Sequence, residues 1–110
     1  MITGGSSGIG LVAAHKFADA GAITIICGLD QDKLDEACRK AKSKGYKFVA
    51  YPADIVDIAD CDRFVQTLIA NHGGVDFLIS NAGCSIRRAI EASYDRFHDF
   101  ECTMQLNYFG

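Results

Sequence analysis

The sequence lacks the features that would place it in a membrane or in an oxidising compartment. No apolar run approaches the roughly 18 residues that a membrane span needs, and no basic-then-apolar signal segment opens the chain. The five cysteines, at positions 27, 38, 61, 84 and 102, form no C-x-x-C pair. An odd number of widely spaced cysteines is typical of reduced thiols rather than of a disulfide framework. We therefore expect the protein in the cytoplasm.

The sequence also has no excess of positive charge and no metal-ligand pattern. Its net charge of −3 gives no electrostatic reason to expect nucleic acid as a partner. His98 and Cys102 are one helical turn apart, but two residues do not make a metal site. Repeats, linkers and low-complexity segments are absent as well. With 110 residues, 49% of them hydrophobic, the chain is at most one globular domain.

The most informative segment is TGGSSGIG, which begins at Thr3. Gly4 and Gly8 permit backbone angles closed to other residues, and a missing Cβ lets a pyrophosphate approach the main chain. Gly10 would let the following helix lie close to a sheet, and the hydroxyls of Ser6 and Ser7 add donors. Because a helix N-terminus attracts anions, the segment predicts a phosphate-binding turn that opens a helix.

The same letters match the G-x-S-x-G nucleophile elbow of serine hydrolases, with Ser6, Asp76 and His98 in the required chain order. An elbow nucleophile normally follows several earlier strands, whereas only part of one strand precedes Ser6. The hydrolase hypothesis is therefore much the weaker one.

Strand-like and helix-like segments alternate along the chain, which predicts an α/β fold with a doubly wound parallel sheet. A ligand site is then expected at the carboxyl ends of the strands. After a short first strand, the expected strands are 22–27, 47–51 and 75–79. The expected helices are 9–20, with Ile9, Ala13, Phe17 and Ala20 facing the core, 31–44, one capped by Asp57 or Asp60, and one from Ser93 to near Asn107.

Only Met1 and Ile2 precede the glycine segment, although a strand is typically about five or six residues long. The last residues, up to Gly110, also read as the middle of a domain. We interpret residues 1–110 as the N-terminal part of a dinucleotide-binding domain, truncated at both ends.

The pattern Thr3-Gly-x-x-x-Gly8-x-Gly10, then Asp54-Ile55, Asn81-Ala82-Gly83 and Asn107, resembles the short-chain dehydrogenase/reductase family over the whole chain. The resemblance implies a Rossmann-like sheet, here incomplete, with about four strands in the order 3-2-1-4. It implies NAD(P) as cofactor and hydride transfer between carbonyls and alcohols. The stretch from Ser85 onward is similar to bacterial fatty acyl-CoA reductases.

The resemblance also implies roles for single residues. Asp54 and Ile55 would contact adenine, and Asn81, Ala82 and Gly83 would let the cofactor pass over small side chains. The implied pyrophosphate and ribose contacts are Gly4, Ser6, Ser7, Gly8, Ile9, Gly10, Leu29 and Asp30. Simpler interpretations stay open: Asp54 as a turn cap, Asn81-Ala82-Gly83 as an ordinary turn, and Asp30 as the cap of the next helix. Since no arginine is placed for a 2′-phosphate, the pattern leans weakly to NAD.

Asn107 would belong to the Ser-Tyr-Lys-Asn catalytic tetrad of that family, or would simply cap its helix. Helical spacing puts it on one face with Phe97, Phe100 and Met104, pointing toward an apolar core. None of the four tyrosines, at 46, 51, 94 and 108, is followed by a lysine four residues on.

The sequence therefore predicts the NAD(P)-binding portion of an oxidoreductase without its catalytic acid. The alternative is a stand-alone nucleotide-binding module. The expected partner is a dinucleotide, with a small-molecule or acyl substrate only in an intact enzyme, and oligomers are possible.

Overall fold

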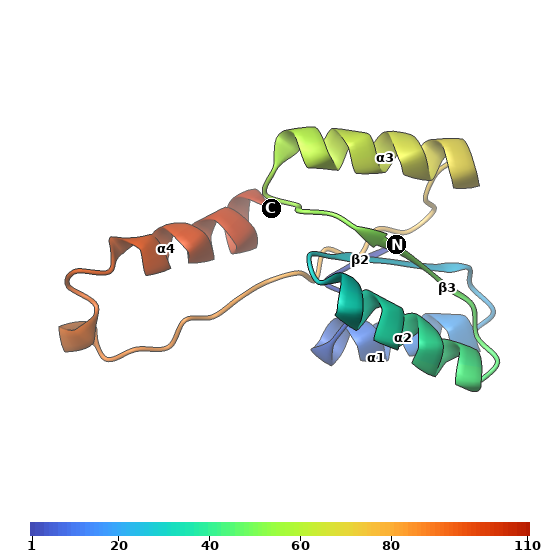
Figure 1. Cartoon of the computed structure of the whole chain (residues 1–110), viewed down its shortest axis with the longest axis horizontal. Helices are drawn as coiled ribbons and strands as arrows, with labels where there is room; N and C mark the ends of the chain where they lie inside the picture. Colours follow the sequence, from blue (N-terminus) through green and yellow to red (C-terminus); the bar gives the residue numbers. More distant parts are fainter.

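The computed structural model describes residues 1–110 as a parallel sheet with helices on both faces (Figure 1). Helices α1 and α2 cover one face, and α3 covers the other. None of the helices is long and apolar enough to cross a membrane. The elements in chain order are β1 (Ile2–Thr3), α1 (Gly8–Asp19), β2 (Thr24–Gly28), α2 (Gln31–Ser43), β3 (Phe48–Pro52), α3 (Ile58–His72), the 3₁₀ turn η1 (Ile90–Ala92), α4 (Phe97–Met104) and the π-helical turn η2 (Gln105–Phe109).

The sheet has the order β3-β2-β1, and all its strands are parallel. The expected fourth strand lies beside β1, as the order 3-2-1-4 requires, but it is reduced to one isolated bridge between Ile79 and Ile2. The N–H of Thr3 donates to the oxygen of Ile79 at 3.0 Å, and the N–H of Ile79 donates to the oxygen of Met1 at 2.9 Å. The sheet thus has three full strands where about four were predicted, because β1 offers only two residues for pairing.

The hydrophobic core forms two clusters, one on each face of β2. Ile25 and Ile26 point to opposite faces because side chains alternate along a strand, so β2 is buried on both sides as predicted. The first cluster, under α1 and α2, contains Ile2, Ala14, Ile26, Leu34, Ala37, Ala41 and Phe48. The second, under α3, contains Ile25, Cys27, Ala53, Phe64 and Leu68.

The buried face of α1 differs from the predicted one. Ile9 is 82% exposed and Phe17 is also exposed, whereas Gly10 and Ala14 are buried. A Cβ added to Gly10 would lie 2.4 Å from the oxygen of Gly4, so only a residue without one fits there. The helix therefore turns its smallest residues, rather than its largest apolar ones, toward the sheet.

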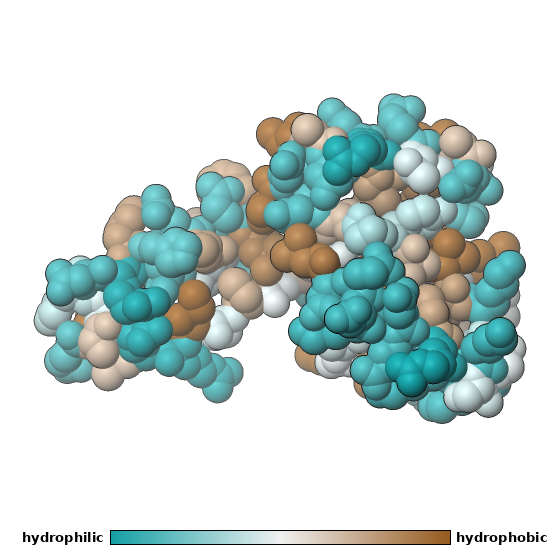
Figure 2. Space-filling model, viewed as in Figure 1, coloured by the Kyte–Doolittle hydropathy of each residue, from teal (hydrophilic) through white to brown (hydrophobic).

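Residues after Gly83 form an arm that extends away from the sheet (Figure 1). Its helix α4 begins at Phe97, later than the expected Ser93, and its apolar residues are exposed rather than packed in the core. Apolar side chains are visible at its surface and where it meets the body (Figure 2). The buried residue of α4 is Asp99, which accepts hydrogen bonds from Nε of Arg88 at 3.2 Å and Nε of Arg96 at 2.9 Å. An ion-pair cluster therefore holds this arm together.

Candidate dinucleotide site

The glycine segment turns sharply between β1 and α1. Gly4 and Gly8 have φ values of 63° and 53°, a region that residues with a Cβ rarely adopt. A Cβ on Gly4 would lie 2.9 Å from Cα of Ala82, whereas a Cβ on Gly8 would meet nothing within 4 Å. Gly4 is therefore required by protein packing. The space beside Gly8 is open to a ligand.

Helix α1 presents its N-terminus to the same open space. Its N-cap residue, Ser7, is extended and makes no side-chain hydrogen bond to the helix. The first N–H groups of a helix have no partner within it, and the helix dipole adds partial positive charge there. The hydroxyl of Ser6 forms no hydrogen bond to the protein either, so donors gather beside Gly8.

Thr3 and Asn81 join the glycine turn to the segment that follows Ile79. The Thr3 hydroxyl oxygen accepts from the N–H groups of Asn81 at 2.9 Å and Ala82 at 3.0 Å. In return, Nδ2 of Asn81 donates to the oxygen of Thr3 at 3.0 Å. Because Thr3 is buried, these contacts fix the relative position of the two loops.

The carboxyl ends of the strands border a cavity of about 500 Å³. All the predicted cofactor residues line it except Gly10, which lies beneath it against Gly4 and Asn81. The lining residues are Gly4, Ser6, Ser7, Gly8, Ile9, Cys27, Gly28, Leu29, Asp30, Lys33, Ala53, Asp54, Ile55, Asn81, Ala82, Gly83 and Leu106.

Sequence reasoning missed five of these lining residues. Cys27, Gly28 and Ala53 follow from the rule that ligands bind where parallel strands end, and could have been found. Lys33 lies in the first turn of α2, three residues after the predicted site residue Asp30. Leu106 lines the cavity from η2, and no sequence pattern around it indicates a binding site. Burial raises the pKa of the Cys27 thiol to about 11, so it is a neutral wall of the cavity at neutral pH.

Asp30 is the N-cap of α2, which bears out the simpler interpretation of this residue. Its Oδ1 accepts from the N–H of Lys33 at 3.1 Å, and its Oδ2 lies 3.0 Å from Nζ of Lys33. The hydrogen bond from the Lys33 side chain is the main reason that the pKa of Asp30 is lowered. Both carboxylate oxygens therefore already have partners within α2, although Asp30 still faces the cavity.

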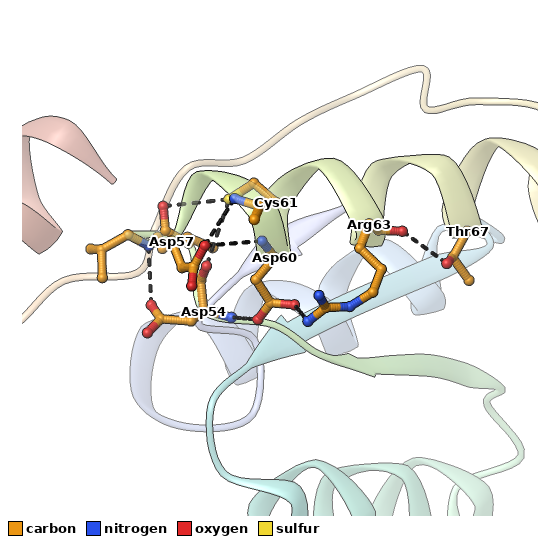
Figure 3. A network of polar contacts seen from close by, with 9 residues as sticks. Asp54, Asp57, Asp60, Cys61, Arg63 and Thr67 are labelled. Atoms are coloured by element: carbon orange, nitrogen blue, oxygen red, sulfur yellow. Dashed lines mark hydrogen bonds and ion pairs between the residues drawn. The ribbon is translucent and has the colours of Figure 1, made fainter.

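Asp54 and Ile55 follow β3 and line the cavity from the side of α3. The Asp54 Oδ1 accepts from the N–H of Val56 at 3.0 Å, so this carboxylate also stabilises its own turn. Helix α3 begins just beyond, with Asp57 as its N-cap and not Asp60. Figure 3 shows the polar contacts between this turn and the first turn of α3.

Asn107 does not point into an apolar core, and that prediction was wrong. Its Oδ1 accepts from the N–H of Cys84 at 2.9 Å, and its Nδ2 donates to the oxygen of Cys84 at 2.8 Å. Two causes explain the difference. The arm does not pack on the sheet, and the π-helical turn η2 changes the facing of residues that follow Met104.

Comparison with known proteins gives this geometry a context. The sequence model of the family described as short chain dehydrogenase matches residues 1–110. The chain belongs to the short-chain dehydrogenase family. The Fatty acyl-CoA reductase of Acinetobacter baylyi is 48% identical over 110 residues, which are all of this chain and 37% of that protein. A Fatty acyl-CoA reductase of Mycobacterium tuberculosis is 38% identical over the same share of each chain. This member of the family thus spans 37% of the length of both relatives.

Solved short-chain dehydrogenases share the fold. The gluconate 5-dehydrogenase from Burkholderia cenocepacia, in complex with NADP and tartrate, superimposes with a TM-score of 0.83 at 28% identity, over 97% of this chain and 41% of that one. A short-chain dehydrogenase/reductase from Mycobacterium ulcerans superimposes with a TM-score of 0.84 at 29% identity, over 98% of this chain and 40% of that one. These matches support a Rossmann-type sheet as predicted.

Proposed function

We propose that residues 1–110 form the NAD(P)-binding portion of a short-chain oxidoreductase that transfers hydride between a carbonyl or alcohol and the cofactor. The observation that carries this proposal is the open space beside Gly8 at the N-terminus of α1, inside a cavity bordered by the strand ends. The NADP complex of the structurally similar gluconate 5-dehydrogenase supports it.

The residues divide the cavity into regions of different chemistry. The N–H groups that open α1, with the hydroxyls of Ser6 and Ser7, suit a pyrophosphate. Asp54 suits an exocyclic amine, which its carboxylate can accept from, and Ile55 offers main-chain groups to the same ring. The chemistry of hydride transfer belongs to the nicotinamide that the cofactor supplies.

Similarity to the fatty acyl-CoA reductases leads us to propose that the complete protein acts on fatty acyl-derived substrates.

Within the residues described, Asn107 is our candidate for a contribution to catalysis. Its side chain holds Cys84, so its contribution is to fix the loop that borders the cavity.

Nucleotide titration tests the proposal with a pair of matched variants. Gly8 and Gly21 both have positive φ and open space where a Cβ would lie, but only Gly8 borders the cavity. We expect Gly8→Val and Gly21→Val to strain the backbone similarly, whereas only Gly8→Val should abolish binding of ADP-ribose measured by calorimetry. Equal affinity in both variants, or no binding by the unaltered chain, would contradict the proposal.

The second candidate is a nucleotide-binding module without catalysis, which would use the glycine turn and the cavity alone. The genomic sequence after codon 110 distinguishes the two. A continuing reading frame with a serine and Tyr-x-x-x-Lys supports the oxidoreductase, and its absence supports the module.

A further inference from the structure

The turn that lines the cavity at Asp54 and Ile55 is bonded to two residues that do not line it. The N–H of Asp54 donates to Oδ2 of Asp60 at 2.7 Å. The thiol of Cys61 lies 3.7 Å from the oxygen of Asp54 and 3.5 Å from the oxygen of Ile55, as a donor to both. Neighbouring residues of α3 therefore hold both the N–H and the carbonyl groups of this turn, as Figure 3 shows for Asp60 and Cys61 beside Asp54.

We propose that Asp60 and Cys61 are positioning residues that set the affinity and selectivity of this site for adenine, by holding the Asp54–Ile55 turn against α3. The inference rests on the proposed function, since it takes Asp54 and Ile55 as the adenine contacts.

The Asp60 side chain and the first turn of α3 are themselves held in place by further contacts. Asp57 caps α3, with its Oδ1 accepting from the N–H groups of Ala59 at 2.8 Å and Asp60 at 3.1 Å. The Asp60 carboxylate is also paired with Arg63. The Asp60 side chain is 21% exposed and that of Arg63 is 72% exposed, so the inner oxygen faces Asp54 while the cation screens the outer side. Rotation of Asp60 away from Asp54 would break this pair as well as the bond to the turn.

The thiol of Cys61 is suited to donate its hydrogen to the backbone oxygens of Asp54 and Ile55. Partial burial, followed by the charges of Asp60, Asp54, Asp57 and Asp62, raises the pKa of this thiol. Cys61 therefore keeps its hydrogen at neutral pH, and only the protonated thiol can donate to two carbonyl oxygens.

Loss of Asp60 or Cys61 should weaken the recognition of adenine and leave phosphate binding unchanged. Oδ1 of Asp54 is used by Val56, which leaves Oδ2 for the amine of adenine. Hydrogen bonds weaken steeply with misalignment. A small displacement of the turn would therefore weaken the hydrogen bond between Asp54 and the amine of adenine. The groups proposed to bind phosphate lie at α1, on the other face of the sheet from α3 (Figure 1). We therefore expect phosphate binding to be independent of this turn.

AMP and IMP separate these effects, because IMP carries an oxygen in place of the amine and cannot donate there. For the 110-residue chain we expect AMP to bind about tenfold more tightly than IMP, which corresponds to one charge-assisted hydrogen bond. Asp60→Ala and Cys61→Ala should bring this ratio toward one by weakening AMP while leaving IMP nearly unchanged. Asp60→Asn keeps an accepting oxygen and should keep the ratio.

Asp62→Ala is the matched control, because it removes a neighbouring carboxylate that makes no contact with the turn and should leave the ratio unchanged. Should Asp60→Ala fail to fold, Cys61→Ala decides by the same criterion. A ratio unaltered in the folded variants, or a parallel loss of AMP and IMP, overturns the inference while leaving nucleotide binding itself intact. Failure of the unaltered chain to bind either nucleotide would overturn the proposed function too.

Discussion

The side-chain amide of Asn107 and the backbone of Cys84 exchange two hydrogen bonds, of 2.9 and 2.8 Å. A Cβ added to Gly83 would lie 3.0 Å from Oδ1 of Asn107, so the loop and the amide are in close contact. At its other end the loop is held by Thr3 through Asn81 and Ala82. The wall of the cavity from Asn81 to Cys84 is thus fixed at both ends by residues distant in sequence.

Asn107→Asp should loosen this wall locally. The carboxylate can still accept from the N–H of Cys84, but it faces the Cys84 oxygen without a donor. Because both groups are exposed, we expect a loss of only about 0.5–1.5 kcal/mol. Hydrogen exchange should show faster exchange at the Cys84 amide. Gln105→Glu makes the same chemical change where no side-chain hydrogen bond exists, and equal effects in both variants would contradict this account.

Thr3→Val should destabilise the whole fold. It keeps the size of the side chain but leaves the half-buried N–H groups of Asn81 and Ala82 without an acceptor, which we expect to cost about 1 kcal/mol each. Urea unfolding measures the difference. Thr24→Val is the control, because Thr24 is equally buried but its hydroxyl makes only one long bond, of 3.4 Å. A larger loss of unfolding free energy in Thr24→Val than in Thr3→Val would contradict this prediction.

Nucleotide binding should depend on the glycine turn more than on Asp30. Asparagine caps helices as well as aspartate does, so Asp30→Asn keeps α2 intact. Since the Asp30 carboxylate is exposed and already paired with Lys33, we expect this variant to change ADP-ribose affinity by no more than about threefold. Calorimetry measures the loss of ADP-ribose affinity in Asp30→Asn and in Gly8→Val. A larger loss in Asp30→Asn than in Gly8→Val would show that Asp30 is the dominant contact and would contradict this prediction.

The 110-residue chain by itself should turn over no carbonyl or alcohol with any nicotinamide cofactor. No tyrosine lines the cavity, and the phenol of Tyr46 is bonded to Asp19, which raises its pKa and makes it a poorer acid. General acid catalysis by a tyrosine therefore has no donor at this cavity. The assay follows the absorbance of the reduced nicotinamide. A signal proportional to protein and lost in Gly8→Val would disprove this expectation.

Acid should loosen α4 and the rest of the arm before it affects the sheet. Hydrogen bonding from Arg96, and then the charges of Arg96 and Arg88, lower the pKa of Asp99 below its ordinary value of 3.8. A carboxyl with a lowered pKa in the folded state stabilises that state above its unfolded pKa, and this contribution is lost as the pH falls through its folded pKa. Hydrogen exchange in α4 should therefore accelerate below about pH 4. Asp99→Asn should abolish this step, whereas Asp95→Asn, which removes an unpaired carboxylate, should preserve it.

The sequence by itself determined the features that depend on neighbours along the chain. The positive φ of Gly4 and Gly8, the helix stops, and the alternation of strand and helix all follow from local residue types. The alternation also placed most of the cavity lining correctly, because parallel strands all end at one edge of their sheet.

Only the tertiary structure decided which partner each polar side chain takes. The side chain of Asn107 binds the backbone of Cys84, 23 residues away, and Thr3 accepts from the backbone of Asn81 and Ala82, more than 70 residues away. The packing of α1 through Gly10 rather than Ile9 is of the same kind, since the close approach of Gly4 selects the smallest residue. Periodicity records which residues share a face, whereas the contacts of a face depend on how closely two elements approach and on which distant loop lies opposite.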